Sequence, residues 1–363
     1  MKRIIISGGG TGGHIFPAVA IADELKRQFP EVEILFVGAE GKMEMEKVPQ
    51  AGYKIIGLPI AGLQRKLTLK NLALPFKIVK SIVRARKIVK EFQPQVVIGV
   101  GGYASGPTLK AASMLGIPTL VQEQNSFAGK TNMLLAKKAT TLCVAYEGME
   151  KFFPKEKIVM TGNPVRLEVT QIEGKRSEAF AFYGLDASRP TLLVIGGSLG
   201  ARTLNESLIA GIEQLQQAGI QVLWQCGKLY YEELISRLKG KDLTGIHLTQ
   251  FIARMDLAYA LADVIVSRAG AISVSELCLI QKPAILVPSP NVAEDHQTHN
   301  AMALVNKQAA VLVKDADART TLINEVIQLM NNKEVQTTLA ANIAQLGKPG
   351  ATKAIVSEIT KIG

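Results

Sequence analysis

The chain has 363 residues, of which 47% are hydrophobic and 20% charged, and its formal net charge is +11. This length predicts about two domains, and the composition excludes a disordered or collagen-like chain. Three scattered cysteines (Cys143, Cys226 and Cys278) exclude a disulfide framework and a Cys-x-x-Cys zinc site, and favour a reducing compartment. The first apolar run ends at Ser7, too soon for a signal peptide, and glycines and prolines break the later uncharged stretches. We therefore expect no membrane-spanning helix.

Thirteen short apolar runs, most without polar alternation, predict parallel strands that are buried on both faces. In chain order these are residues 3–7, 32–37, 54–58, 96–100, 119–122, 141–145, 157–160, 191–195, 222–226, 246–249, 264–267, 284–287 and 310–313. Helical periodicity lies between them, and the examples are residues 18–28, 204–217 and 320–330, followed by a tail at 351–362. The alternation predicts βαβ units, and therefore an α/β fold of doubly wound parallel sheets.

Two of the predicted strands lead into a glycine loop and then a helix. The first loop is Gly8–Gly13, and the second is Gly196–Gly200. Two such starts predict two Rossmann-like domains, with a junction near Gly162-Asn163-Pro164. We expect an N-terminal domain at 1–163 and a C-terminal domain at 164–344. The pattern alone does not assign the tail to either of them.

The first glycine loop, Gly8-Gly9-Gly10-Thr11-Gly12-Gly13, satisfies the pattern G-x-G-x-x-G. Glycines after a strand let a ligand approach the backbone, and the following helix start offers N–H groups to a phosphate or diphosphate. A dinucleotide site would also need an acidic residue after the second strand. Glu40 is available there, but a dinucleotide enzyme does not explain the second loop. A tight structural turn is the other alternative.

Three further strands end in polar or small-residue loops, at 99–107, 122–125 and 267–276. In the last of these, a helix start could receive a diphosphate, and Glu276 could accept hydrogen bonds from a ribose diol. Glu276 could equally be an ordinary first-turn acid. Because ligands bind at the carboxyl ends of parallel strands, these loops together predict a binding site.

His14 directly follows the first loop and is a candidate general base, because imidazole titrates near neutral pH. A helix-start histidine bonded to the backbone is the alternative. His296 and His299 could belong to a metal cluster, although polar sugar-binding loops have the same composition. Asp315-Ala316-Asp317 resembles a metal–diphosphate motif, but no glycine loop precedes it and we interpret it as a surface turn.

The net charge is confined to the first half of the chain. Residues 1–165 hold 23 Lys and Arg against 12 Asp and Glu, whereas residues 166–363 are neutral overall. Between Arg65 and Lys90 lie nine basic residues and no acidic one, interleaved with aliphatic side chains. This segment predicts either a helix on an anionic membrane surface or a solvated helix face. Nucleic acid fits less well, since Phe76 is the one aromatic residue there and stacking needs several.

Seven segments resemble motifs of the MurG family, the bacterial N-acetylglucosaminyltransferases of peptidoglycan synthesis. They read ISGGGTGGHIFPAVAIADEL (6–25), IGVGGYASGP (98–107), QEQNSFAGKTN (122–132), TGNPVR (161–166), GGSLGARTLNE (196–206), SRAGAISVSEL (267–277) and DHQTHNA (295–301). The resemblance follows nearly the whole chain in order. It implies the GT-B fold, in which two Rossmann-like domains face each other across a cleft and a C-terminal helix, here within 345–363, crosses back to the first domain.

The resemblance implies transfer of N-acetylglucosamine from UDP-N-acetylglucosamine (UDP-GlcNAc) to the muramyl 4-hydroxyl of lipid I, undecaprenyl-diphosphoryl-MurNAc-pentapeptide. The product is lipid II, formed with inversion, and the activity serves cell-wall synthesis, cell shape and division. We expect no cofactor and no metal. The expected partners are UDP-GlcNAc, lipid I and the anionic cytoplasmic face of the cell membrane, where the protein would be peripheral, and not nucleic acid.

When the family's functional residues are transferred motif by motif, the resemblance implies a donor site, an acceptor-diphosphate site and a membrane patch. The donor site would comprise Thr11, Gly12, Gly13, Asn125, Arg166, Ser198, Ile252, Glu276 and Gln297. Among these, Arg166 and Ser198 would serve the diphosphate, the Ile252 backbone the uracil, Glu276 the ribose and Gln297 the sugar hydroxyls. The acceptor diphosphate would face Gly9, Gly10, Gly101, Gly102 and Tyr103. The membrane patch would comprise Lys70, Lys77, Lys80 and Arg84.

His14 is the expected general base of the transfer, and Glu123 is the next candidate. The chain departs from the family at Gln122, where many members have histidine, so the role of that position stays open. Two other classes of protein remain. One is another GT-B enzyme that uses UDP-GlcNAc, such as a 2-epimerase or a glycolipid transferase. The other is a non-catalytic nucleotide- or membrane-binding protein, which the full set of loops disfavours.

Overall fold

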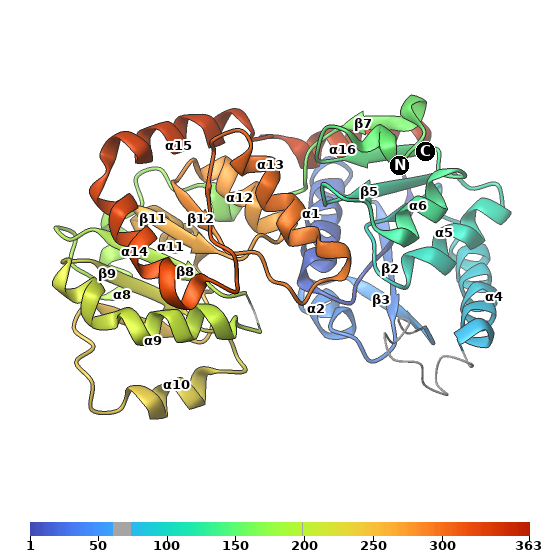
Figure 1. Cartoon of the computed structure of the whole chain (residues 1–363). Coiled ribbons are helices and arrows are strands. Elements are labelled where there is room, and N and C mark those ends of the chain that lie inside the picture. Colours follow the sequence, from blue (N-terminus) through green and yellow to red (C-terminus); the bar gives the residue numbers. More distant parts are fainter. Residues whose placement is uncertain (61–73, 198) are drawn as a thin grey trace. The chain divides into compact units, whose positions relative to one another are not determined.

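The computed structural model describes residues 1–60, 74–197 and 199–363, which fall into two units. The first unit is Met1–Arg166 together with Gly350–Gly363, and the second is Leu167–Pro349. Figure 1 shows that each unit has its own sheet with helices packed against it. The chain therefore leaves the first unit near Arg166 and returns to it for its last helix.

The first unit is built on seven parallel strands in the order β3-β2-β1-β4-β5-β6-β7. The strands are β1 (Arg3–Ser7), β2 (Glu33–Ala39), β3 (Lys54–Leu58), β4 (Val96–Gly99), β5 (Thr119–Glu123), β6 (Thr141–Val144) and β7 (Ile158–Met160). The helices are α1 (Gly12–Gln28), α2 (Glu44–Gln50), α4 (Leu74–Phe92), α5 (Ser105–Met114), α6 (Lys130–Ala136), η1 (Met149–Lys151), η2 (Lys155–Lys157) and α16 (Ala351–Ile362). The order reverses between β1 and β4, which is where parallel sheets bind ligands.

Both faces of this sheet are buried, as its continuous apolar strands require. Ile4 and Ile6 of β1 belong to the cluster that α1 and α16 cover, whereas Ile5 belongs to the cluster under α4 and α5. Three side chains of α16 are fully buried in the first cluster: Ile355, Val356 and Ile359. The C-terminal helix is thus part of the core of the first unit.

The second unit has six parallel strands in the order β10-β9-β8-β11-β12-β13. The strands are β8 (Thr191–Ile195), β9 (Gln221–Gln225), β10 (Ile246–Thr249), β11 (Val264–Ser267), β12 (Ala284–Leu286) and β13 (Val311–Leu312). The helices are α7 (Leu167–Thr170), α8 (Arg176–Tyr183), α9 (Arg202–Gln217), α10 (Tyr231–Leu238), α11 (Met255–Leu261), α12 (Ala271–Ile280), η3 (Ala293–Asp295), α13 (His296–Val305), α14 (Ala318–Asn331) and α15 (Lys333–Gln345). Here the order reverses between β8 and β11.

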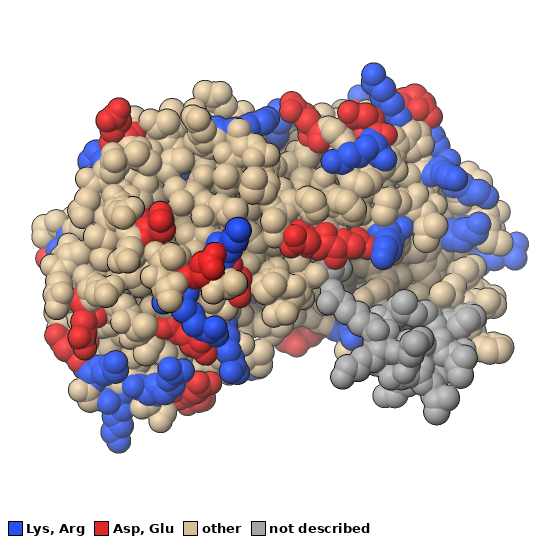
Figure 2. Space-filling model, viewed as in Figure 1, with Lys and Arg blue, Asp and Glu red and all other residues tan. Residues whose placement is uncertain are grey.

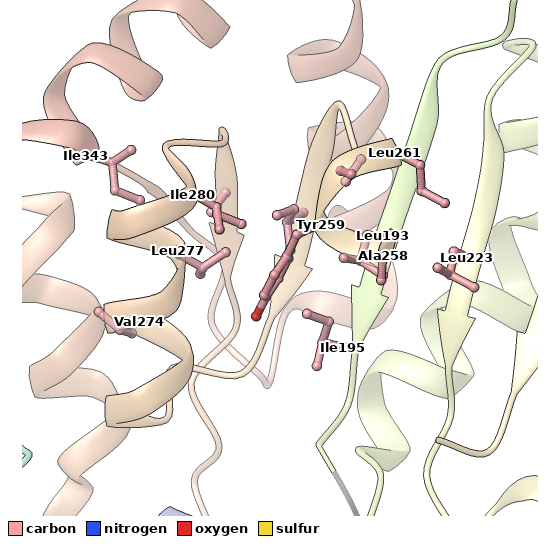
Figure 3. Close-up of a cluster of buried hydrophobic side chains, with 14 of the residues drawn as sticks. Leu193, Ile195, Leu223, Ala258, Tyr259, Leu261, Val274, Leu277, Ile280 and Ile343 are labelled. Atoms are coloured by element: carbon pink, nitrogen blue, oxygen red, sulfur yellow. The ribbon is translucent and has the colours of Figure 1, made fainter. Parts of the chain in front are cut away.

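One core of the second unit lies between the sheet and helices α11, α12 and α15. Figure 3 shows Tyr259 between the side chains of α12, among them Leu277, and those of β8, among them Ile195. The ring of Tyr259 is fully buried, and the hydroxyl is its polar end. A buried tyrosine hydroxyl needs a hydrogen-bond partner, and the partner here belongs to the candidate site.

Each of the thirteen predicted strands is confirmed, and so is the tail helix at 351–362. The first helix was predicted to begin at residue 18, but α1 begins at Gly12. Glycines are poor helix formers, so the periodicity alone hid this first turn. The basic segment is helical from Leu74, and its residues 65–73 lie outside the described part of the chain. No helix in the described residues is long and apolar enough to cross a bilayer.

Candidate active site

The first glycine loop turns sharply between β1 and α1. Gly9 and Gly10 have φ of 148° and 88°, values that favour glycine, and Thr11 is the extended residue before the helix. Gly12 and Gly13 form the first turn of α1, where backbone N–H groups have no partner inside the helix. This geometry presents the donors that an anion needs at a helix start.

A second glycine turn, Gly101-Gly102, follows the neighbouring strand β4. Its residues have φ of 94° and 87°, and a Cβ on Gly102 would collide with the carbonyl oxygen of Gly9. The two loops therefore touch backbone to backbone, which only glycines allow. Tyr103 follows them with a 48% exposed side chain. The structure thus brings together the residues that were predicted to face the acceptor diphosphate.

His14 lies across both turns. Its Nδ1 is 3.0 Å from the carbonyl oxygen of Gly9, and a Cβ on Gly101 would lie 2.8 Å from its Nε2. A neutral imidazole that donates from Nδ1 has its lone pair on Nε2, so this contact favours the tautomer that can accept a proton there. The predicted alternative, a histidine bonded to the backbone, is also present, and the two roles are compatible.

Glu123, at the end of β5, is buried and accepts four hydrogen bonds. One carboxylate oxygen accepts from the backbone N–H and the side-chain amide of Asn125, at 3.0 and 3.2 Å. The other accepts from the Gly129 N–H at 3.0 Å and from the Asn132 amide at 2.8 Å. A carboxylate held in this way fixes the loop 124–132, and its lone pairs are already used.

Hydrogen bonds of amide side chains connect the end of β5 to the segments that follow β4 and β7. Gln122 donates to Asn163 at 3.1 Å, and Gln124 donates to the carbonyl oxygen of Val100 at 2.8 Å. All three amide residues, Gln122, Gln124 and Asn163, are at most 3% exposed. The position that departs from the family is therefore a buried link between β5 and the end of the first unit.

Arg166, the last residue of the first unit before the crossover, lies over the ring of Phe16, with 5.2 Å between the guanidinium carbon and the ring centroid. This places its charge beside the first turn of α1. Glu40, the acid that a dinucleotide site would use, is instead paired with Arg84 at 2.5 Å. The structure therefore favours the phosphate loop over the dinucleotide alternative.

The glycine loop of the second unit follows β8. Gly197 and Gly200 have φ of 82° and 87°, and a Cβ on Gly200 would collide with the Cys226 carbonyl oxygen. The amide of Gln225 bonds both sides of Gly197, accepting from its N–H at 3.2 Å and donating to its carbonyl at 2.9 Å. Sequence reasoning missed Gln225, because nothing in its strand marks it. Ser198 lies outside the described residues.

Three further donor residues lie around this sheet. Glu276 is on α12, after β11, and its carboxylate accepts a hydrogen bond from Tyr259 at 2.7 Å. Gln297 is in the first turn of α13, after β12, and accepts from the Ser289 N–H at 2.8 Å. Ile252 follows β10 and is buried in the same cluster as Tyr259. Glu276 and Gln297 thus follow neighbouring strands.

Asp315-Ala316-Asp317 forms a turn at the surface, as predicted, but Asp315 also takes part in an ion pair that the sequence did not indicate. Its carboxylate pairs with Arg268, which follows β11, and accepts from the Thr203 hydroxyl at 3.0 Å. Arg268 also donates to the carbonyl oxygen of Val287 at 2.9 Å. Asp315 is 19% exposed, and it follows β13, which pairs with β12, the neighbour of β11. These contacts link the loops that follow β11, β12 and β13.

The histidines of the loop 294–300 do not form a metal cluster with their neighbours. His296 lies 3.2 Å from Glu294, and in the described ranges 1–60, 74–197 and 199–363 no three His, Cys, Asp or Glu side chains are grouped to hold an ion. The alternative of a polar sugar-binding loop therefore remains for this segment.

Helix α4 has both apolar and basic residues on its solvent side. Phe76, Val79 and Val83 are 79%, 60% and 65% exposed, and Lys77 and Lys80 lie among them. Ser81, Ala85 and Val89, on the opposite side, are buried. In Figure 2, basic side chains gather without acidic ones on the edge of the first unit where α4, α5 and α6 lie. Lys70 is outside the described residues.

Two parallel α/β units, each with a glycine loop between its central first strand and the following helix, are consistent with the GT-B class of glycosyltransferases. Residues 4–144 match the glycosyltransferase family 28 N-terminal domain, and residues 191–355 match the family 28 C-terminal domain. The chain belongs to glycosyltransferase family 28.

Two relatives of this chain with the same name are similar to it over nearly its full length. A protein of Cytophaga hutchinsonii is 58% identical over 360 residues, which cover 99% of this chain and 96% of the relative. A protein of Phocaeicola vulgatus is 56% identical over 361 residues, with the same coverage. Both are named UDP-N-acetylglucosamine–N-acetylmuramyl-(pentapeptide) pyrophosphoryl-undecaprenol N-acetylglucosamine transferase. The crystal structure of Acinetobacter baumannii MurG is similar with a TM-score of 0.80 and 32% identity, covering 99% of this chain and all of that one.

Proposed function

We propose that the chain transfers N-acetylglucosamine from UDP-GlcNAc to the 4-hydroxyl of the muramyl sugar of lipid I and so forms lipid II. The named relatives, at 56% and 58% identity over nearly the full length, support this substrate pair. The observation that carries the chemistry is the contact of His14 with the two glycine turns of the first unit. It combines a proton acceptor with a loop suited to a diphosphate.

The second unit is the donor domain of this proposal. Glu276 would accept hydrogen bonds from the ribose diol, because a carboxylate has about four lone-pair sites and can accept from several donors at once. Gln297 would contact the sugar, and the Ile252 backbone the uracil. Ser198 and Arg166 would serve the diphosphate, and Thr11, Gly12, Gly13 and Asn125 of the first unit are the remaining donor residues of the proposal.

The first unit is the acceptor domain. The diphosphate of lipid I would lie on the turns formed by Gly9, Gly10, Gly101 and Gly102, with Tyr103 beside them. Backbone N–H groups at the start of α1 would stabilise its charge. His14 would then stand near the muramyl 4-hydroxyl, which lies across the sugar ring from the diphosphate in lipid I.

The proposed transfer is a single inverting displacement. His14 Nε2 takes the proton of the muramyl 4-hydroxyl while its oxygen attacks the anomeric carbon, and the bond between that carbon and the UDP oxygen breaks. UDP leaves with the electron pair, and the anomeric carbon inverts to a β-1,4 bond. The N–H groups at the start of α12 and in the second glycine loop would stabilise the departing diphosphate. Glu123 is better placed to hold its loop than to act as the base, because its lone pairs are occupied.

Membrane binding at the cytoplasmic face belongs to the same proposal. The acceptor is a polyprenyl lipid, so the first unit must approach the leaflet that holds it. The exposed apolar stripe of α4 would insert shallowly, and Lys77 and Lys80 would meet anionic headgroups. Arg84 contributes less, because Glu40 already neutralises it.

Analysis of the product tests the function. After reaction of UDP-GlcNAc with a soluble lipid I analogue, proton NMR of the purified product should show a β anomeric coupling and a shifted muramyl H4 signal. A product that is instead free UDP-N-acetylmannosamine would identify a 2-epimerase. Binding of UDP without any product would identify a non-catalytic protein.

A further inference from the structure

A buried carboxylate lies directly beneath the first glycine loop. Glu44, in the first turn of α2, is 1% exposed. One of its carboxylate oxygens accepts from the N–H of Gly10 at 2.8 Å, and the other accepts from the N–H of Ala39, the last residue of β2, at 3.0 Å. The carboxylate therefore links the loop after β1 to the end of the neighbouring strand.

The Glu44 side chain packs against two glycines, and a side chain on either of them would overlap it. A Cβ on Gly9 would overlap the Glu44 carboxyl group, and a Cβ on Gly38 would lie 2.6 Å from its Cγ. Both glycines therefore have a packing reason to be glycine, in addition to the φ of 148° at Gly9. A carboxyl group is a costly choice for a purely structural link beneath a loop that is proposed to hold a diphosphate, because burial away from water and a nearby anion both disfavour a carboxylate.

The peptide unit between Gly9 and Gly10 connects Glu44 to His14. Its N–H, on Gly10, donates to Glu44, and its carbonyl oxygen, on Gly9, accepts from His14 Nδ1 at 3.0 Å. Because the peptide is planar and trans, these two groups point in opposite directions and the two side chains hold it from opposite sides. A carboxylate at the N–H end polarises the peptide and makes its oxygen a stronger acceptor.

We propose that Glu44 is a positioning residue for His14, acting through the Gly9–Gly10 peptide. It keeps the imidazole proton on Nδ1 and the lone pair on Nε2, and it stabilises the imidazolium that forms when Nε2 takes the proton of the acceptor hydroxyl. The arrangement performs the task of the aspartate in a catalytic triad, with a peptide unit inserted between carboxylate and imidazole. The inference rests on His14 being the general base of the proposed function.

The first test is the tautomer of His14 in the unmodified full-length chain. Long-range ¹⁵N–¹H spectra of ¹⁵N-histidine-labelled protein, assigned with His14→Gln, should show the neutral ring protonated at Nδ1. Glu44→Gln should raise the fraction protonated at Nε2. A wild-type ring protonated at Nε2 would overturn the proposal without any variant at position 44.

The second test is kinetic. Glu44→Gln should lower kcat roughly 10–100-fold, the usual loss when the partner that orients a functional histidine is removed, with the donor KM unchanged. Glu24→Gln is the matched control, because Glu24 is a buried carboxylate on α1 that bonds Arg27 and not the loop. It should keep kcat. In a His14→Ala background, Glu44→Gln should add almost no further loss.

The outcomes distinguish the proposed role of Glu44 from the proposed role of His14. An equal loss from Glu44→Gln in the wild-type and His14→Ala backgrounds would make Glu44 a structural support of the loop and contradict the inference. Full activity of Glu44→Gln together with a large loss in His14→Ala would contradict the inference and leave the proposed function intact. Full activity of His14→Ala would contradict the proposed base itself.

Discussion

The hydroxyl of Tyr259 lies 2.7 Å from a carboxylate oxygen of Glu276. The ring of Tyr259 is fixed in the core between β8 and α12, so the hydroxyl has few alternative positions (Figure 3). The core of the second unit thereby determines where the carboxylate of Glu276 lies. In the proposed function, a buried residue would in this way influence the binding of a nucleotide.

Tyr259→Phe should weaken UDP-GlcNAc binding by about 1 kcal/mol, roughly fivefold, because one hydrogen bond to a charged group is lost and Glu276 is less ordered. Isothermal calorimetry measures the effect. Tyr183→Phe is the matched control, since Tyr183 belongs to the same cluster and donates to the backbone of Arg254 at 3.1 Å. Equal affinities of the two variants would show that Tyr259 does not act on the donor site.

His14→Ala should lower kcat by about 10²–10⁴-fold, the usual contribution of a general base. The affinity for UDP-GlcNAc should change little, because His14 is not among the donor-binding residues of the proposal. Steady-state kinetics and calorimetry together separate the two effects. Near-normal turnover of the variant would make His14 a structural residue.

The α4 surface should bind anionic vesicles. Reversal of Lys77 and Lys80 to Glu should reduce co-sedimentation with phosphatidylglycerol vesicles at low salt, since each cation near the surface contributes about 1 kcal/mol. Reversal of Lys239 and Lys241, exposed lysines of the second unit, is the control with the same change in net charge. If both double variants bind alike, or neutral vesicles bind equally well, α4 is an ordinary solvated helix.

Asp256 should make the fold sensitive to acid. Hydrogen bonds from Arg254, at 2.9 and 2.8 Å, and from Lys175 hold the pKa of this buried carboxyl well below its usual range. A lowered folded-state pKa stabilises the protein above the unfolded pKa of about 3.9, and this stability is lost as the pH falls below that value.

Asp256→Asn should therefore be less stable than the wild type at pH 7, and the difference should shrink at pH 3. Urea unfolding at both pH values measures it, with Glu173→Gln, at an exposed position, as the control that should show no difference at either pH. A difference between wild type and Asp256→Asn that does not depend on pH would contradict the account of this ion pair.

The sequence was sufficient for the strands, because a parallel strand buried on both faces leaves a continuous apolar run such as Ile4–Ile6. It was also sufficient for the glycine loops, since the turn after β1 needs residues that tolerate a positive φ. These features are local, and each one is visible within a few neighbouring residues.

The side-chain partnerships were not predictable in the same way. Glu44 is 34 residues from Gly10, and Asp315 is 47 residues from Arg268, so only the sheet order brings each pair together. Asp315 is a turn residue as predicted, but its pairing with Arg268 depends on strands elsewhere in the sequence. Gln225 and Tyr259 carry no motif, and their partners are defined by the fold.

The central claim is that the chain transfers a sugar to a lipid-linked acceptor. The most direct measurement is the release of UDP from UDP-GlcNAc by the purified full-length chain, with and without a lipid I analogue. The account predicts UDP release only when the analogue is present, with one disaccharide-containing product formed per UDP. Release of UDP at the same rate without the analogue, or no release with it, would contradict the account.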